Sequence, residues 1–121
     1  RCKDILESVG QYLPRMTFDP ANFVVNNVKP FDRAYPLVKD YIEYVHIKDA
    51  KFSPDHIIIT PAGYGDGQIF ELLSALHNRG FDGFLSLEPH LNLAGKPGFS
   101  GVELFKKAAQ SLKEILNQIN P

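Results

Sequence analysis

The chain has 121 residues, of which 44% are hydrophobic and 12% aromatic, a composition typical of a globular domain with one buried core. Its formal net charge of −1 provides no basic field for DNA or RNA, so we expect no nucleic-acid partner. Cys2 is the only cysteine, and no apolar run approaches the roughly 20 residues that span a bilayer, so we expect a cytoplasmic protein without a membrane partner.

The first part of the chain alternates between helical and extended patterns. Apolar residues at helical spacing predict an amphipathic helix that ends within 10–14, where glycine and proline occur. A short strand is predicted at 16–19. A second helix is predicted at 31–42 from apolar residues three to four positions apart, and Pro36 should distort its first turns.

The same alternation continues through the middle of the chain. A strand is predicted at 44–49, and a long loop follows at 51–67 with a β-rich patch at 56–60. An apolar stripe predicts a helix over 69–76, which Arg79 and Gly80 should end. A third strand is predicted at 83–88.

The last predicted element is a helix that starts with Ser100 and Glu103 in capping-box spacing. Its expected apolar side comprises Val102, Phe105, Ala109, Leu112 and Leu116. Alternating helices and strands build a parallel sheet covered by helices, so we interpret residues 1–121 as one α/β structural unit.

Each of the three predicted strands ends in a side chain that can bind a metal ion: Asp19, His46 and Glu88. The carboxyl ends of parallel strands converge on one face, where active sites lie, so these side chains can meet. A donor set of oxygen and nitrogen suits Mn²⁺, Mg²⁺, Co²⁺ or Zn²⁺. Taken singly, each residue has an ordinary alternative as a helix cap, a structural histidine or a solvated carboxylate.

Four motifs carry a resemblance to a known family. Residues 18–22, 45–49, 61–67 and 87–90 occur in the order of motifs in the xylose isomerase-like TIM barrel superfamily, and the chain resembles its sugar phosphate isomerase/epimerase branch. The resemblance extends over essentially the whole chain. It implies a (β/α)8 barrel, of which residues 1–121 supply about the last three βα units as the C-terminal part of a single domain.

The resemblance also implies a divalent-metal site. Its metal ligands in this chain would be Asp19, His46 and Glu88, and a further Glu would lie before Arg1. Glu88 would be the catalytic residue that moves protons next to a carbonyl, with the metal stabilising an enediolate. Mn²⁺ is the expected ion. The implied activity is isomerisation or epimerisation of a sugar or sugar phosphate, with a sugar or polyol as the small-molecule partner.

Further residues near these motifs are candidates for binding substrate. We assign Asn22, Lys48, Asp49 and His90 to this role, although Asn22 has an alternative as a turn cap and the Lys48–Asp49 pair as structural support. The glycine-rich residues 63–67 are interpreted as setting loop geometry rather than as holding an anion.

Other functions stay open at this point. A dehydratase of inositol-type ketones shares the implied fold. An apurinic endonuclease is disfavoured, because Asn22 and residues 66–68 lack the additional histidine ligands implied for such enzymes. The chain could also be a non-catalytic fragment or half-barrel, inactive alone, that forms homo-oligomers or associates with the missing N-terminal part of the barrel, since three strands do not close a barrel.

Overall fold

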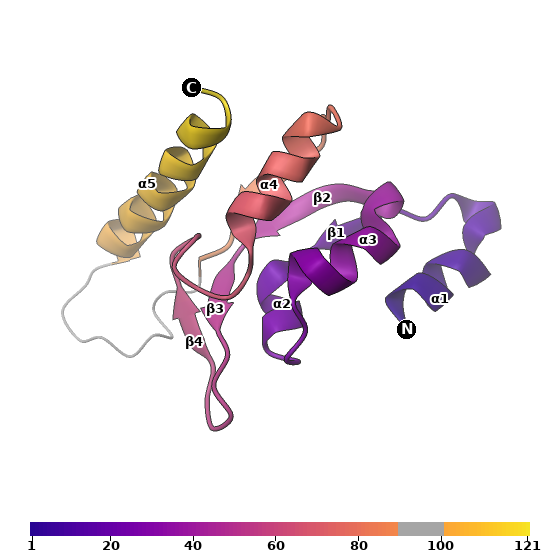
Figure 1. Cartoon of the computed structure of the whole chain (residues 1–121), viewed down its shortest axis with the longest axis horizontal. Helices are drawn as coiled ribbons and strands as arrows, with labels where there is room; N and C mark the ends of the chain where they lie inside the picture. The colour runs from indigo at the N-terminus through magenta and orange to yellow at the C-terminus, as the bar shows by residue number, and fades with distance from the viewer. Residues whose placement is uncertain (90–100) are drawn as a thin grey trace.

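The computed structural model describes residues 1–89 and 101–121, which form a small parallel sheet with helices packed against it (Figure 1). The helices are α1 (Cys2–Ser8), α2 (Pro20–Val24), α3 (Tyr35–Val38), α4 (Ile69–Asn78) and α5 (Gly101–Ile119). The strands are β1 (Met16–Phe18), β2 (Ile42–Ile47), β3 (Asp49–Lys51), β4 (Ile58–Thr60) and β5 (Phe84–Leu87). Shorter turns lie at Gly10–Tyr12, Pro30–Ala34 and Lys39–Tyr41.

The main sheet contains three parallel strands in the order β1-β2-β5. Phe18 of β1 lies opposite Val45 of β2, and Ile47 of β2 lies opposite Leu87 of β5. The three carboxyl ends therefore meet at one edge. Directly after β2 the chain turns into an antiparallel hairpin formed by β3 and β4. Strand β4 lies within the β-rich patch expected at 56–60, whereas its partner β3 begins before the predicted loop and was not predicted as a separate strand.

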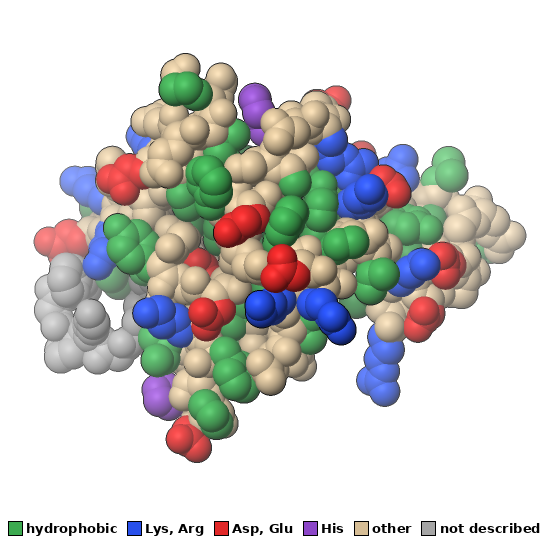
Figure 2. Space-filling view, viewed as in Figure 1, with side chains coloured by type: hydrophobic (Ala, Val, Ile, Leu, Met, Phe, Trp, Pro, Cys, Tyr) green, Lys and Arg blue, Asp and Glu red, His purple; other side chains and the backbone are tan. Residues whose placement is uncertain are grey.

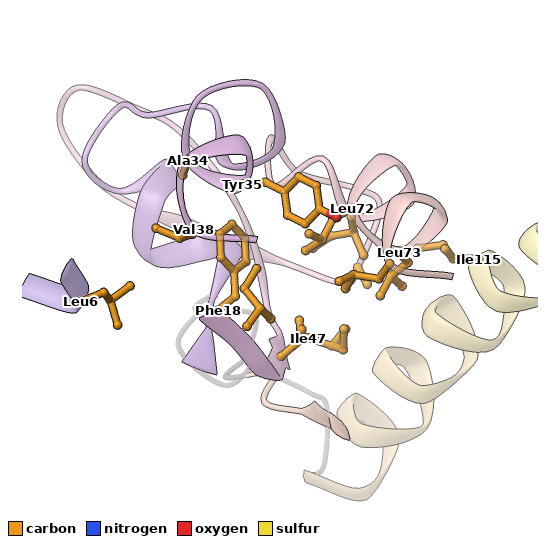
Figure 3. Packing of buried hydrophobic residues seen from close by; sticks show 14 residues of the cluster. Leu6, Phe18, Ala34, Tyr35, Val38, Ile47, Leu72, Leu73 and Ile115 are labelled. Carbon is orange, nitrogen blue, oxygen red and sulfur yellow. The ribbon is translucent and has the colours of Figure 1, made fainter. Parts of the chain in front are cut away.

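Helices cover one face of the sheet and enclose the hydrophobic core. Phe18 and Ile47 point from the sheet toward Tyr35 and Leu72, and Ile115 of α5 closes one side of this packing (Figure 3). Strand alternation explains which side chains face the helices, because successive residues point to opposite faces. In β2, Val45 and Ile47 are buried while Tyr44 and His46 are only partly covered.

The opposite face of the sheet is open in the described residues. The rings of Tyr44 and Phe84 lie beside each other on this face, 6.0 Å apart, and Phe84 is 72% exposed. Strands β1, β2 and β5 thus form an open sheet, and the described residues show no barrel closure. About three βα units of a barrel were expected, and the main sheet contains three parallel strands.

The second predicted helix differs most from expectation. Residues 31–42 do not form one regular helix: a π turn at Pro30–Ala34 leads into α3, a 3₁₀ turn follows, and Ile42 already belongs to β2. Proline has no backbone N–H and restricts the residue before it, and Pro36 lies in the first turn of α3, as the expected distortion required. The short helix α2 was not predicted.

The last helix buries a different set of residues from the predicted stripe. Val102, Phe105 and Leu116 of the predicted apolar side are exposed, so that side does not pack as a whole, whereas Leu112 packs against the core. The buried residues of α5 are Ala108, Ser111 and Ile115. The expected cap at Ser100 lies outside the described residues.

Charged side chains are interspersed on the surface. On the face shown in Figure 2, Lys and Arg side chains lie among Asp and Glu side chains without a large patch of either sign. Within the described residues, no helix combines the length and the apolar character needed to cross a membrane.

Candidate metal centre

The three strand-end residues lie together in the folded chain. Asp19 directly follows β1, His46 is the fifth residue of β2, and Glu88 directly follows β5. The sheet register brings them to the same edge, and the N–H of Glu88 donates to the carbonyl of Ile47, which continues the pairing beyond β5. One ligand atom of each residue lies within 4.8 Å of the others. We call Asp19, His46 and Glu88 the strand-end cluster.

The distances within the strand-end cluster are short. His46 Nδ1 lies 2.9 Å from Glu88 Oε2 and 3.8 Å from Asp19 Oδ2. Asp19 is buried, whereas the side chains of His46 and Glu88 are 35% and 34% exposed. The cluster is therefore anchored in the protein at Asp19 and accessible to solvent at Glu88.

Asp19 has two structural partners. Its Oδ1 accepts the backbone N–H of Asn22 at 3.3 Å, so that Asp19 is the N-cap of α2, and Pro20 occupies the first helical turn. Its Oδ2 faces His46 and Lys48. Asp19 is therefore a helix cap through its Oδ1 and a member of the strand-end cluster through its Oδ2.

The strand-end cluster fits a divalent metal ion. Ions such as Zn²⁺ and Mg²⁺ bind carboxylate oxygen and imidazole nitrogen at about 2.0 to 2.2 Å, so ligand atoms around one ion lie up to about 4.4 Å apart. The span of 4.8 Å is close to this limit and small side-chain movements would close it. Two carboxylates and one imidazole form a mixed donor set suited to Mn²⁺, Mg²⁺, Co²⁺ or Zn²⁺.

Lys48 approaches the same oxygens. Its Nζ lies 3.3 Å from Asp19 Oδ2 and 3.7 Å from Glu88 Oε2, and its side chain is only 14% exposed. Lys48 lies two residues beyond His46, so strand alternation directs both side chains to the same side. Of the three residues assigned to substrate that the structure describes, Lys48 is the one whose side chain lies in the strand-end cluster.

Asp49 faces the other way. It is 1% exposed, and its carboxylate accepts four backbone N–H groups. Oδ1 accepts from Ala50 and Gly67, and Oδ2 accepts from Gly63 and Gly65, at distances of 2.8 to 3.0 Å. Burial raises the pKa of Asp49, while these hydrogen bonds partly oppose the rise. Asp49 therefore has a structural role, which was the alternative to substrate binding in the sequence analysis.

The glycines of the loop explain its close wrapping around Asp49. We call residues 61–67 the glycine loop. A Cβ at Gly65 or Gly67 would meet the Oδ1 of Asp49, and Gly63 adopts a φ of +82° beside Ile115. The loop is also tied to β3, because Asp66 N–H donates to the Ala50 carbonyl at 2.7 Å. The interpretation of these glycines as setting loop geometry agrees with this arrangement.

The remaining predicted site residues lie at different places. Asn22 is exposed on α2, and its carbonyl accepts the side-chain amide of Asn26, while the helix cap belongs to Asp19 and not to Asn22. His90 lies outside the described residues. His56 and His77 are exposed.

Gln68 is a structural contact that the sequence did not reveal. It directly precedes α4 with a φ of 52°, and its side-chain carbonyl accepts the N–H groups of Phe31 and Asp32 at 3.1 and 3.2 Å. It links the start of α4 to the π turn more than 30 residues earlier in the chain. No local sequence pattern identifies such a contact. By contrast, strand alternation predicts that the side chains of Lys48 and Asp49 point to opposite sides.

The geometry defines a class: an α/β protein with metal-type ligands at the carboxyl ends of parallel strands. The chain matches the family model described as xylose isomerase-like TIM barrel over residues 1–115, and it therefore belongs to this family. The resemblance of the four sequence motifs to the xylose isomerase-like superfamily is confirmed. The family includes sugar isomerases and epimerases as well as endonucleases. No curated protein and no solved structure matches the chain.

Proposed function

We propose that this chain provides Asp19, His46 and Glu88 to the divalent-metal site of a sugar or sugar phosphate isomerase or epimerase. The observation that supports the proposal most is the convergence of these residues, within 4.8 Å, at the ends of three neighbouring parallel strands. In TIM barrels, catalytic residues come from this end of several different strands. Family membership supports the same chemistry.

Each residue of the strand-end cluster has a proposed role. A bound divalent ion, Mn²⁺ in the first place, would polarise the substrate carbonyl and stabilise negative charge on its oxygen. Asp19 and His46 would hold the ion, with His46 neutral and bound through one ring nitrogen. Glu88 would bind the ion and also act as general base, because a carboxylate beside a carbon next to a carbonyl can take up a proton and return it.

The proposed substrate is a small sugar or polyol with a carbonyl group. Lys48 can donate hydrogen bonds to its oxygens, since the ammonium lies beside Asp19 and Glu88. Asn22 and His90 stay proposed substrate contacts. Neither nucleic acid nor membrane belongs to the proposal.

An endonuclease is a weaker proposal for this chain. The additional histidine ligands implied for such enzymes would stand at Asn22 and within 66–68. Gln68 instead uses its side-chain carbonyl to hold the π turn at Phe31 and Asp32. This position therefore supports the fold in this chain and offers no additional imidazole.

Calorimetric titration with Mn²⁺ tests the proposal. The chain, with any sequence that naturally flanks it, is compared with His46→Ala, Glu88→Gln and the control His77→Ala, which removes an exposed histidine of α4. We expect stoichiometric binding that both cluster substitutions weaken by about tenfold or more, because each removes one ligand. Binding in His77→Ala should equal that of the wild type.

Activity is then measured as epimerisation of ketoses in the presence of Mn²⁺. We expect Glu88→Gln to lose turnover, because the amide cannot accept the proton. Absence of Mn²⁺ binding in the wild type, or binding that ignores both cluster substitutions, would exclude the metal-enzyme assignment. Metal binding without turnover on any ketose would retain the site and redirect the search to dehydration of polyol ketones.

A further inference from the structure

Lys48 and His46 face the same two oxygen atoms. The Nζ of Lys48 and the Nδ1 of His46 both lie within 3.8 Å of Asp19 Oδ2 and of Glu88 Oε2. The Lys48 side chain is 14% exposed and that of Asp19 is 7% exposed, so water only partly screens this contact. The ammonium is therefore placed among the atoms that the proposed metal ion would need.

Electrostatics gives this arrangement a consequence. Two carboxylates that converge at a partly buried position repel each other, and an ammonium between them offsets the repulsion. A divalent ion bound to the same oxygens would lie close to that ammonium and repel it. Both cations cannot keep their full contact with Asp19 and Glu88 at the same time.

We propose that Lys48 is an internal counter-ion that competes with the metal ion for Asp19 and Glu88, and that metal binding releases its ammonium toward the substrate. This inference rests on the proposed function. The flexible four-carbon stem of lysine lets the ammonium move while its Cα stays at the end of β2. Metal would then bind before substrate, and the released ammonium would donate to a substrate oxygen.

The competition predicts an increase in metal affinity when the ammonium is removed. Lys48→Met keeps an unbranched apolar stem without the charge, and Lys51→Met is the matched control, because Lys51 is an exposed lysine on β3. In Mn²⁺ titrations without substrate, we expect Lys48→Met to bind on the order of tenfold more tightly than the wild type. Lys51→Met should bind as the wild type does.

Thermal unfolding of the same proteins provides a second readout. Without metal, Lys48→Met should unfold at a lower temperature than Lys51→Met, because its two carboxylates have lost their counter-ion. Saturating Mn²⁺ should narrow that difference, since the ion replaces the ammonium and binds more tightly to the variant.

The outcomes separate this inference from the proposed function. Wild-type Mn²⁺ binding that depends on His46 and Glu88, together with equal or weaker binding in Lys48→Met, would overturn the competition and leave the metal site intact. Wild-type protein that takes up no Mn²⁺ would overturn both. Tighter binding in Lys48→Met with an unchanged control would establish Lys48 as the competing cation.

Discussion

The Asp49→Asn substitution tests how the glycine loop is held against the end of β2. Asparagine has nearly the shape of aspartate, but one carboxylate oxygen becomes an NH₂ group that cannot accept hydrogen bonds. Each oxygen of Asp49 accepts two backbone N–H groups. Either orientation of the amide therefore leaves two donors facing another donor.

The geometry also indicates which orientation is preferred and how much it costs. The N–H groups of Gly63 and Gly65, which donate to Oδ2, are partly buried, whereas those of Ala50 and Gly67 are buried. The NH₂ group should replace Oδ2, where water can reach the donors. Two unsatisfied donors at about 1 to 3 kcal/mol each suggest a loss of about 2 to 4 kcal/mol, the lower part of the range because of this access.

Urea unfolding at neutral pH measures this loss, and amide hydrogen exchange locates it. We expect protection to fall at Gly63 and Gly65 in Asp49→Asn. Asp66→Asn is the control, because exposed Asp66 accepts a single N–H, from Phe52 at 2.8 Å, and should cost less than about 1 kcal/mol. A loss in Asp49→Asn no larger than in the control, with unchanged exchange in the glycine loop, would refute the reasoning.

The pH dependence of Asp49→Asn and two further substitutions provide additional tests. Burial raises the pKa of Asp49 above 3.8, so the folded state binds the carboxyl proton more tightly than the unfolded state does. The stability advantage of the wild type over Asp49→Asn should therefore shrink as pH rises from 3.8 through the raised pKa. Urea unfolding across this pH range measures the difference in stability, and a difference that stays constant would contradict the prediction. Gly67→Ala places a Cβ 2.5 Å from Asp49 Oδ1 and should lower the free energy of unfolding by about 1 to 3 kcal/mol. The control Gly10→Ala, whose Cβ has no atom within 4 Å, should not lower it. Equal stabilities of the two variants in urea would exclude the close contact at Gly67. Leu72→Ala at a fully buried site should cost about 2 to 5 kcal/mol by thermal unfolding, against little for exposed Phe70→Ala, and the reverse order would contradict the core described above.

The strand-end cluster was predictable because its signal is local. Asp19, His46 and Glu88 each end a short apolar segment, and parallel topology alone brings such ends together. The identity of the segments as strands needed only their β-rich composition. The distances within the cluster depend on the register between neighbouring strands. No pattern in the sequence indicates that Val45 pairs with Leu85, so these distances could not be predicted.

The second predicted helix failed for a different reason. Apolar residues over 31–42 have helical spacing, but Pro30 and Pro36 remove backbone donors, and the segment divides into turns of different types. Ile42 satisfies the helical spacing and also the start of β2, so periodicity alone could not place the boundary. Helix α2 is five residues long, too short for a periodic signal, although Asp19 followed by Pro20 is an N-terminal cap pattern.

The end of β2 connects the strand-end cluster to the glycine loop. Along residues 46–49, partly covered side chains alternate with buried ones: His46 and Lys48 lie among the cluster carboxylates, while Ile47 packs in the core and Asp49 holds the glycine loop. Lys48 lies between the end of β2 and the start of β3, and consecutive Cα atoms are held about 3.8 Å apart, so Lys48 and Asp49 cannot shift independently. A change at Asp49 should therefore reach Lys48 through the backbone, and Mn²⁺ affinity should change in Asp49→Asn even though Asp49 contacts no cluster residue among its hydrogen-bond partners. Because side chains alternate along residues 46–49, Lys48 faces the strand-end cluster and Asp49 faces the glycine loop. The backbone that joins these two residues therefore couples the glycine loop to the proposed metal site.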